Sequence, residues 1–407
     1  ATRPSAELAA PGLQLTELFR AAATHNPSIR SAQMEAQASG QDVAAIERQR
    51  WPTFSLTAES NTGNSRNYPT TAAQLEQTVW DFGQLSARIS GAKTNANAGL
   101  VRAQLQQQEV YLQIANTWQN LIGARQRSLA AQETMKRLNE FKDQMNRRVA
   151  SQASPPIDLE LVEARLLQTQ VEQAMADNSI KVAINRLEQL TNLKGLKTRV
   201  DHILPMPGLS QTADFANEVK QIDLTQVALS SSVVARARLE SEKVHQDLEA
   251  LKAQNYPTVY LRTYQPLSKS AAGTDLNTSM TSFIGLKYLP GAGLSTALQA
   301  QAMATRVNAS EEAVKTASLE MEQTLQSDRE ELISALVRLA ALEKSVIGSA
   351  NVLDSYQRQF EANRKTWLDL MNSVRELTQN EYAVVDTQAN AVGAMLRLQI
   401  RLGREPQ

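Results

Sequence analysis

A seven-residue apolar repeat near the C-terminus is the feature that most constrains how this chain can fold. The first series consists of Leu325, Leu332, Leu339, Val346, Leu353, Phe360 and Trp367, and a second consists of Leu370, Leu377, Val384, Ala391 and Leu398. Such spacing keeps one seam of a helix against a partner helix and imposes a left-handed supercoil. No proline interrupts either series. We predict a long antiparallel helical hairpin with its tip at about 363–366.

The hairpin belongs to the second of two similar halves. Residues 51–56 (WPTFSL) are echoed by residues 256–261 (YPTVYL). At a similar offset, the second apolar series is matched in the first half by Leu159, Leu166, Gln173, Ile180 and Leu187. Two matches of different character predict a tandem duplication. The first hairpin would then have its tip at about 151–156.

The composition changes along the chain and suggests where the repeats begin and end. We predict a flexible start at 1–12, repeats at 13–193 and 223–403, and a linker rich in proline and glycine at 194–222. The 42 basic and 42 acidic residues balance, so no nucleic-acid-binding footprint is visible. The chain has no cysteine and only three scattered histidines. We therefore expect no enzyme activity, no cofactor and no metal site.

Four short segments alternate between apolar and polar residues, as strands do. They lie at about 53–60, 73–80, 257–265 and 280–288, two in each half. One side of these strands carries Phe54, Leu56, Val79, Val259, Leu261, Ile284 and Leu286, and the other side is largely polar. The pattern fits either a soluble sandwich or a membrane barrel that is apolar outside and polar inside.

Aromatic residues gather at the ends of the same strands. They are Trp51, Tyr68, Trp80, Tyr256, Tyr264 and Tyr288. Aromatic girdles mark the membrane interfaces of outer-membrane barrels, so these six residues are candidates for interface positions. Four strands cannot close a barrel around water, so a barrel would require several copies of the chain.

This arrangement of two repeats, each with helix, strand, loop, strand and long helical hairpin, resembles the TolC family of outer-membrane channels. The resemblance covers residues 13–403, and it includes Asn26–Pro27 after a short helix and an aromatic–proline pair before each repeat's first strand. It implies a mainly helical fold with a small β part. The family forms a homotrimer with a 12-stranded transmembrane β-barrel in the lipid of the Gram-negative outer membrane. A helical barrel of roughly 100 Å continues it through the periplasm. The resemblance also implies a periplasmic adaptor protein and an inner-membrane transporter as partners.

The resemblance further implies roles for residues at the hairpin tips. Acidic residues just after the second tip narrow the periplasmic aperture in the family, and the matching positions are Asp369 and Asn372. Asn372 departs from the family's second acid. A basic residue near this tip, Lys365 or Arg364, would pair with Asp158 near the first tip. Alternatively, Asp369 caps its helix, and Asp158 simply lies in a first helical turn, where the helix dipole favours an acid.

The nature of the cargo rests on a single feature. Lipidated relatives carry an N-terminal cysteine, whereas this chain starts with Ala1 and Thr2. That difference favours type I secretion, in which an ABC transporter exports a polypeptide such as a large adhesin. A drug or small-molecule efflux channel of the same family is the alternative. A soluble coiled-coil scaffold remains the alternative from another class, although it does not explain the four strands.

Overall fold

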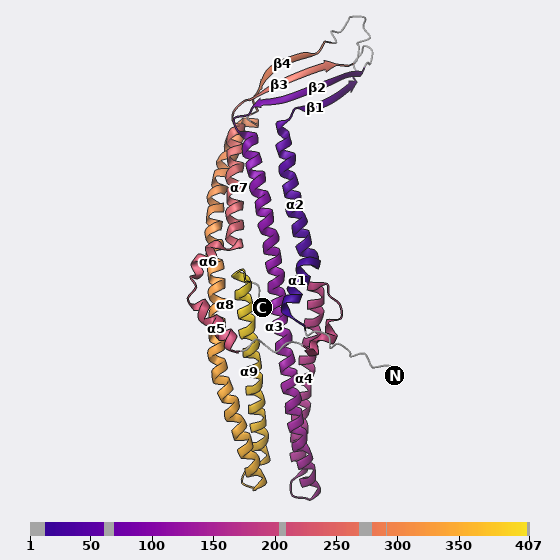
Figure 1. The fold of residues 1–407 in the computed structure, drawn as a ribbon, viewed down its shortest axis with the longest axis vertical. Coiled ribbons are helices and arrows are strands. Elements are labelled where there is room, and N and C mark those ends of the chain that lie inside the picture. The colour runs from indigo at the N-terminus through magenta and orange to yellow at the C-terminus, as the bar shows by residue number, and fades with distance from the viewer. Residues whose placement is uncertain (1–12, 61–68, 203–208, 268–278, 290, 405–407) are drawn as a thin grey trace, which may run out of the picture. The chain divides into compact units, whose positions relative to one another are not determined.

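The computed structural model describes residues 13–60, 69–202, 209–267, 279–289 and 291–404. This part of the chain is mainly helical, with one small antiparallel sheet, in agreement with the predicted fold class (Figure 1). The helices are α1 (Leu15–His25), α2 (Pro27–Glu47), α3 (Gln84–Ala150), α4 (Pro156–Thr191), α5 (Leu209–Lys220), α6 (Leu224–Ser230), α7 (Ser232–Gln254), α8 (Ser295–Glu361) and α9 (Trp367–Arg401). The strands are β1 (Thr53–Ser60), β2 (Pro69–Trp80), β3 (Thr258–Pro266) and β4 (Thr281–Lys287).

The chain divides into two compact units, and each contains segments from both halves of the sequence. One unit comprises 1–30, 106–228 and 322–407, and the other comprises 31–105 and 229–321. The first unit holds the tip-side parts of the two hairpins, and the second holds the sheet together with residues 84–105 of α3 and 295–321 of α8. The division into repeats at 13–193 and 223–403 therefore remains a prediction about the sequence.

Two helices of 67 residues each, α3 and α8, form the outgoing arms of the hairpins. Each ends in the same way, with one residue in the left-handed conformation: Gln152 (φ 59°) after α3 and Asn363 (φ 56°) after α8. At both turns the next backbone N–H donates to a carbonyl five residues earlier, at 2.8 Å. This is the Schellman arrangement, which satisfies carbonyls that the last helical turn leaves free.

Most of the seven-residue seam is buried as predicted, whereas Val346 and Val384 are partly buried. In α8 the side chains of Leu325, Leu332, Leu339, Leu353 and Phe360 are all shielded from solvent. In α9 the same holds for Leu370, Leu377, Ala391 and Leu398. Burial of an a/d-type seam is the main contribution that holds such long helices together, because helix propensity alone is too weak.

The sheet has the strand order β1-β2-β3-β4, and every neighbouring pair is antiparallel (Figure 1). The register places Phe54 opposite Leu75 and Leu261 opposite Ile284. A shift between Thr78 and Trp80 interrupts the β2–β3 ladder. Strand β2 starts four residues earlier than expected, because residues 69–72 pair with β1 despite their loop-like composition.

The predicted linker at 194–222 contains a 3-10 helix, Leu196–His202, and helix α5, and its role as a linker between repeats stays a prediction. The helix expected over 223–254 is broken into α6 and α7, because the hydroxyl of Ser231 accepts a hydrogen bond from the N–H of Val234 at 3.4 Å and caps a new helix. None of the helices in the described part of the chain combines the length and apolar character needed to cross a lipid bilayer.

Candidate functional site

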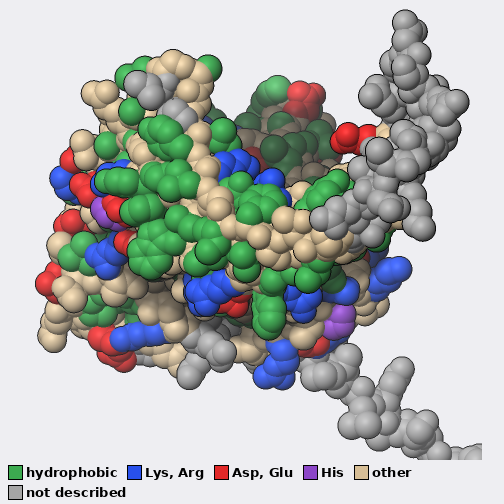
Figure 2. Space-filling view, turned by 90° about the horizontal axis from the view of Figure 1, so that it is seen from above, with side chains coloured by type: hydrophobic (Ala, Val, Ile, Leu, Met, Phe, Trp, Pro, Cys, Tyr) green, Lys and Arg blue, Asp and Glu red, His purple; other side chains and the backbone are tan. Residues whose placement is uncertain are grey.

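One face of the four-stranded sheet is apolar and open to solvent. Directly paired residues of antiparallel strands lie on the same face, so the register gathers Phe54, Leu56, Leu75, Leu261, Ile284 and Leu286 on one side. All six are exposed, and Ile284 retains 76% of its accessible surface. Figure 2, which looks down onto the sheet, shows hydrophobic side chains gathered over the strands. Within the described residues, no second layer covers this face, so the soluble-sandwich interpretation does not hold.

The opposite face of the sheet is organised around an ion pair. The guanidinium of Arg262 donates to the carboxylate of Glu76 at 2.6 Å, and both groups are partly buried. The same guanidinium lies 4.8 Å from the centre of the Tyr260 ring. The ring of Tyr260 in turn covers the bare backbone of Gly285 on β4. Polar and aromatic side chains thus share this face, which is less uniformly polar than expected.

The predicted interface aromatics that the structure describes lie near the ends of the strands or directly beside them. Trp51, Trp80, Tyr256, Tyr264 and Tyr288 are all exposed, and Trp51 retains 74% of its surface. Tyr68 lies outside the described residues. Phe82, which was not among the candidates, joins this group by stacking on Tyr256 at 5.0 Å. Their placement at a membrane interface remains a prediction.

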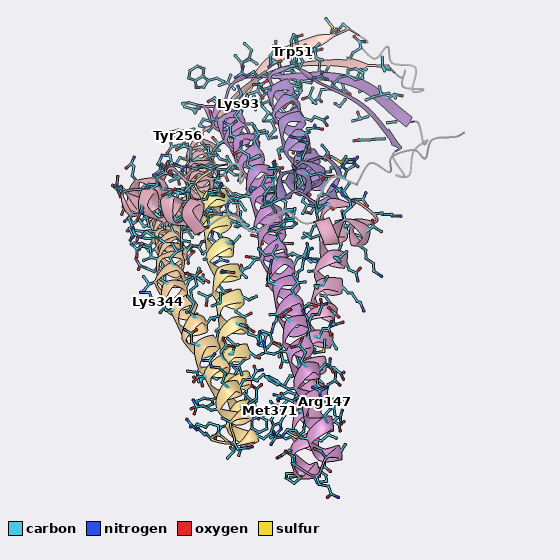
Figure 3. All side chains as sticks on the ribbon, turned by 60° about the horizontal axis from the view of Figure 1, so that its bottom comes forward. Trp51, Lys93, Arg147, Tyr256, Lys344 and Met371 are labelled. Atoms are coloured by element: carbon cyan, nitrogen blue, oxygen red, sulfur yellow. The ribbon has the colours of Figure 1, made fainter. Side chains whose placement is uncertain are left out.

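The two hairpins of the first unit are joined near their tips by an apolar cluster. Figure 3 marks this end of the hairpins with Arg147 on α3 and Met371 on α9. The cluster contains Leu138, Phe141, Met145, Val162, Leu166, Leu353, Phe360, Trp367, Leu370, Met371, Val374 and Leu377. At its end, the ring of Trp367 lies 5.1 Å from Phe360 and 6.1 Å from Phe141. The indole N–H of Trp367 donates to the backbone carbonyl of Asp158 at 2.8 Å, so this side chain connects the hairpins directly.

Asp369 lies in the first turn of α9 and completes a capping box with Thr366. Its carboxylate accepts hydrogen bonds from the hydroxyl of Thr366 at 2.8 Å and from the backbone N–H of the same residue at 3.3 Å. These two hydrogen bonds, with a smaller contribution from the charge of Lys365, lower the pKa of Asp369. The residue is partly exposed, and its side chain keeps 41% of its accessible surface. Asn372, one turn later, is half-buried.

The proposed pairing of Asp158 with a basic residue is not formed within this chain. Among the described ion pairs, Lys365 lies 3.9 Å from Asp369 and has its ammonium over the ring of Tyr356 at 4.4 Å. Arg364 contributes a backbone hydrogen bond to the turn. Asp158 uses its backbone carbonyl rather than its carboxylate to reach the second hairpin. A pairing of these side chains between copies of the chain stays a prediction.

Sequence reasoning missed a basic residue that links the two tips. The guanidinium of Arg148 donates to the side chains of Ser154 at 3.1 Å and Asn363 at 3.3 Å. It also lies over the ring of Phe360 at 4.8 Å. Its position three residues before the first tip was the available signal, because a basic residue in the last turn of a helix meets free carbonyls and neighbouring loops.

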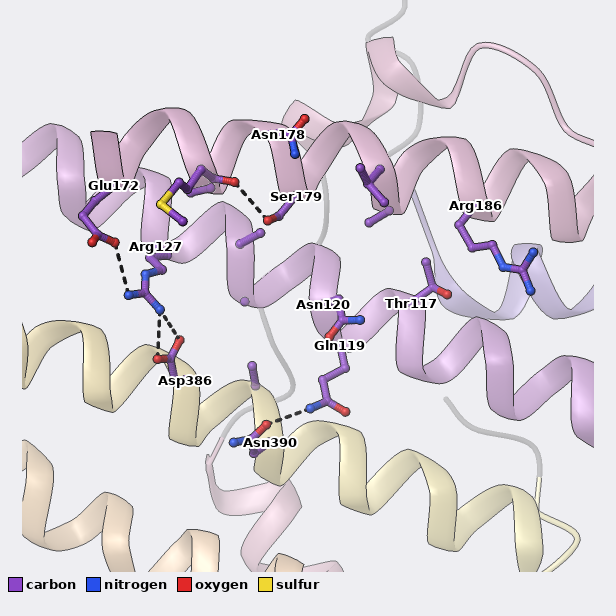
Figure 4. A pocket seen from close by; sticks show the side chains of 17 residues that line it. Thr117, Gln119, Asn120, Arg127, Glu172, Asn178, Ser179, Arg186, Asp386 and Asn390 are labelled. Carbon is purple, nitrogen blue, oxygen red and sulfur yellow. Dashed lines mark hydrogen bonds and ion pairs between the residues drawn. The ribbon is translucent and has the colours of Figure 1, made fainter. Parts of the chain in front are cut away.

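A second missed residue, Arg127, connects three helices farther from the tips. From α3 it reaches Glu172 on α4 at 3.3 Å and Asp386 on α9 at 3.1 Å (Figure 4). It borders a hollow of about 870 Å³ whose floor is made of small residues such as Gly123 and Ala389. Within the described part of the chain, no group of His, Cys, Asp and Glu side chains has the geometry to hold a metal ion.

Comparison with known proteins finds one matching family over part of the chain and several solved structures with the same fold. Residues 18–193 match the family described as outer membrane efflux protein. No curated protein matches the chain. Among solved structures, it resembles a membrane protein from Pseudomonas aeruginosa, with a TM-score of 0.78 at 16% identity over 99% of this chain and 96% of that one. It also resembles the outer membrane protein VceC of Vibrio cholerae, with a TM-score of 0.75 at 17% identity over 96% of each chain. A third similar structure is the open state of the MtrE outer membrane channel of Neisseria gonorrhoeae. Its TM-score is 0.77 at 16% identity, over 96% of this chain and 89% of that one.

These likenesses agree with the long helices, the four-stranded sheet and the exposed apolar face. Members of the matched family form homotrimers and work with an adaptor and an inner-membrane pump, and they transport material without catalysing a reaction. The chain therefore has the fold of these outer-membrane channels, and its residues 18–193 match the outer membrane efflux protein family.

Proposed function

We propose that three copies of this chain form the exit duct of a tripartite export system, with a barrel of twelve strands. The observation that carries this proposal is the sheet: it exposes a continuous apolar face, and its outer strands β1 and β4 each have one partner. An exposed apolar face with two open edges is unstable in water. Lipid would cover the face, and neighbouring copies would pair the edges.

The helical unit offers a second surface for contact between copies. Four apolar side chains of α4 are exposed: Leu167 and Val171, together with Met175 and Val182, which also border the larger hollow. On α8, Val337 and Ile347 are exposed in the same way. Helices α3 and α9 already pack together within the chain through Gly123 and Ala389. This leaves α4 and α8 to meet neighbouring copies and close a helical barrel.

At the tip, we propose that Asp369 of each copy faces a shared aperture. Three carboxylates near one axis would attract cations and repel one another. The lowered pKa of Asp369 keeps these groups charged at neutral pH. Asn372 would line the same aperture without adding charge. Asp369 can serve both as helix cap and as aperture residue, because the cap uses its carboxylate without neutralising it.

For the cargo, we propose type I secretion of a polypeptide, such as a large adhesin, with an ABC transporter and a periplasmic adaptor. Efflux of drugs or other small molecules is the second candidate, and the family description favours it. Both cargoes would use the same duct and the same adaptor contacts at the tip. The difference would lie in the inner-membrane partner.

Two measurements test these proposals in turn. Purified protein added to planar bilayers should conduct current with a preference for cations, and it should be a trimer in detergent. A monomer that stays soluble without detergent and conducts no current would contradict the proposed duct. Deletion of the gene from its own bacterium then separates the cargoes. Loss of a surface or secreted polypeptide with unchanged drug sensitivity supports type I secretion, whereas increased drug sensitivity with normal secretion supports efflux.

A further inference from the structure

A small hollow between the two hairpins is lined mainly by hydrogen-bond donors. Its volume is about 230 Å³, and its walls come from α3, α4 and α9, all within the first unit. The lining residues used below are Arg127, Arg165, Glu172, Arg375 and Tyr382. Thr134, Thr169 and Thr378 add hydroxyl groups to the same walls. No function described above uses this hollow.

The charges in this hollow do not balance. Glu172 is the only carboxylate in its lining, and it is already paired with Arg127 (Figure 4). Arg165, on α4, donates from its terminal nitrogen only to the neutral side chain of Gln168. Arg375, on α9, has no ion pair among the described residues. Two arginines from different hairpins, the partly buried Arg165 and the solvent-exposed Arg375, therefore line this hollow without a counter-charge.

Two polar atoms in the lining are buried without a hydrogen-bond partner. They are the Nε of Arg165 and the hydroxyl of Tyr382. A buried donor without a partner is costly, and native structures nearly always supply a partner from protein, water or ligand. Burial raises the pKa of Tyr382, so its hydroxyl stays protonated and acts as a donor. The guanidinium of Arg127, 4.8 Å from the Tyr382 ring centre, holds that side chain in place.

We propose that this hollow binds a small dianion, of the class of phosphate or a short dicarboxylate. Two guanidinium groups match two negative charges, and the free N–H and O–H donors match oxygen acceptors. A cation does not fit, since every unpartnered group is a donor. Because Arg165 lies on α4 and Arg375 and Tyr382 on α9, the bound ion would connect the first hairpin to the second.

The test uses the full chain purified in detergent and titrated with inorganic phosphate or succinate by calorimetry. Sodium chloride at matched ionic strength is the reference. We expect saturable binding of at least one of the two anions and a higher melting temperature in its presence. Arg375→Gln should weaken binding about tenfold or more. Arg338→Gln, at an exposed position on α8 outside the hollow, is the matched control and should bind as the unmodified protein does.

Tyr382→Phe provides the sharper variant, because it keeps the ring and removes only the unpartnered hydroxyl. Without anion it should melt at the same temperature as the unmodified protein or higher, and it should lose most of the gain that the anion confers. Tyr356→Phe, whose ring lies under Lys365 away from the hollow, should keep that gain. The proposal would be overturned if neither phosphate nor succinate shows saturable binding. It would also be overturned if Arg375→Gln and Tyr382→Phe both bind the anion as strongly as the unmodified protein does.

Discussion

Trp367 is the side chain on which the union of the two hairpin tips depends most. It is 3% exposed, it packs on Phe141 and Phe360, and its indole N–H reaches the carbonyl of Asp158 on the other hairpin. A buried Trp removes about 200 Å² from water, which at about 25 cal/mol per Å² amounts to about 5 kcal/mol. Its hydrogen bond adds about 1 kcal/mol.

Two substitutions separate these contributions. Trp367→Ala should destabilise the closed tip by about 3–5 kcal/mol, because it removes the ring and leaves a cavity. Trp367→Phe keeps an aromatic ring but loses the indole N–H and some buried apolar area. It should destabilise the closed tip by about 1–2 kcal/mol. Leu368→Ala is the matched control: its side chain is 55% exposed, so the cost should stay within about 0.5 kcal/mol.

Hydrogen exchange measured by mass spectrometry on the assembled channel reports the local opening of the tip. Amides of residues 353–377 should exchange about a hundred- to a few-thousandfold faster in Trp367→Ala and about 5- to 30-fold faster in Trp367→Phe. Residues 84–105, in the other unit, should not change. Equal exchange in Trp367→Phe and Leu368→Ala would refute the assignment of Trp367 as the link between the tips.

Three further predictions concern the aperture, the cap and the sheet. Asp369→Asn keeps a capping oxygen but removes the charge, so cation selectivity in planar bilayers should fall, whereas Asn372→Asp should raise it; no change in either would contradict an aperture at this position. Thr366→Val should cost about 1 kcal/mol at pH 7 by thermal unfolding. The pKa of Asp369 is lowered in the folded state, so the stabilisation from the hydrogen bond that the Thr366 hydroxyl donates to its carboxylate is present above the ordinary aspartate pKa of about 3.9. That part is lost as the pH falls through the lowered pKa, so the cost of Thr366→Val should shrink in acid. Gly285→Ala would bring a methyl group against the ring of Tyr260 and should destabilise the sheet by about 1–3 kcal/mol. On gels, the trimer should then dissociate at a lower temperature. Adding Tyr260→Ala to the same chain should remove the clash and restore that temperature.

Much of the fold could be predicted because it depends on local periodicity. The spacing of Leu325, Leu332 and Leu339 follows from the number of residues in a helical turn, and these residues are buried in the structure. The alternation around Phe54 and Ile284 likewise follows from the pleat of a strand. The break at Ser231 was missed, because a serine that caps a new helix differs little in sequence from one inside a helix.

The candidate tip residues show where such reasoning ends. A turn followed by Thr366 and Asp369 indicated a capping box, and the cap is formed. The partners of Trp367, Arg148 and Arg127 could not be read in this way, since each contacts groups that are distant in sequence.

By itself, the sequence determined a chain of long paired helices with four amphipathic strands, because helix and strand periods are properties of the backbone and appear wherever one face must be buried. Only the tertiary structure decided that the apolar face of the sheet is left open and that Trp367 reaches Asp158 across 209 residues of chain. It also decided that two guanidinium groups share one hollow without a counter-charge. Such contacts depend on how separate segments pack together, and no spacing along the chain encodes the distance between them.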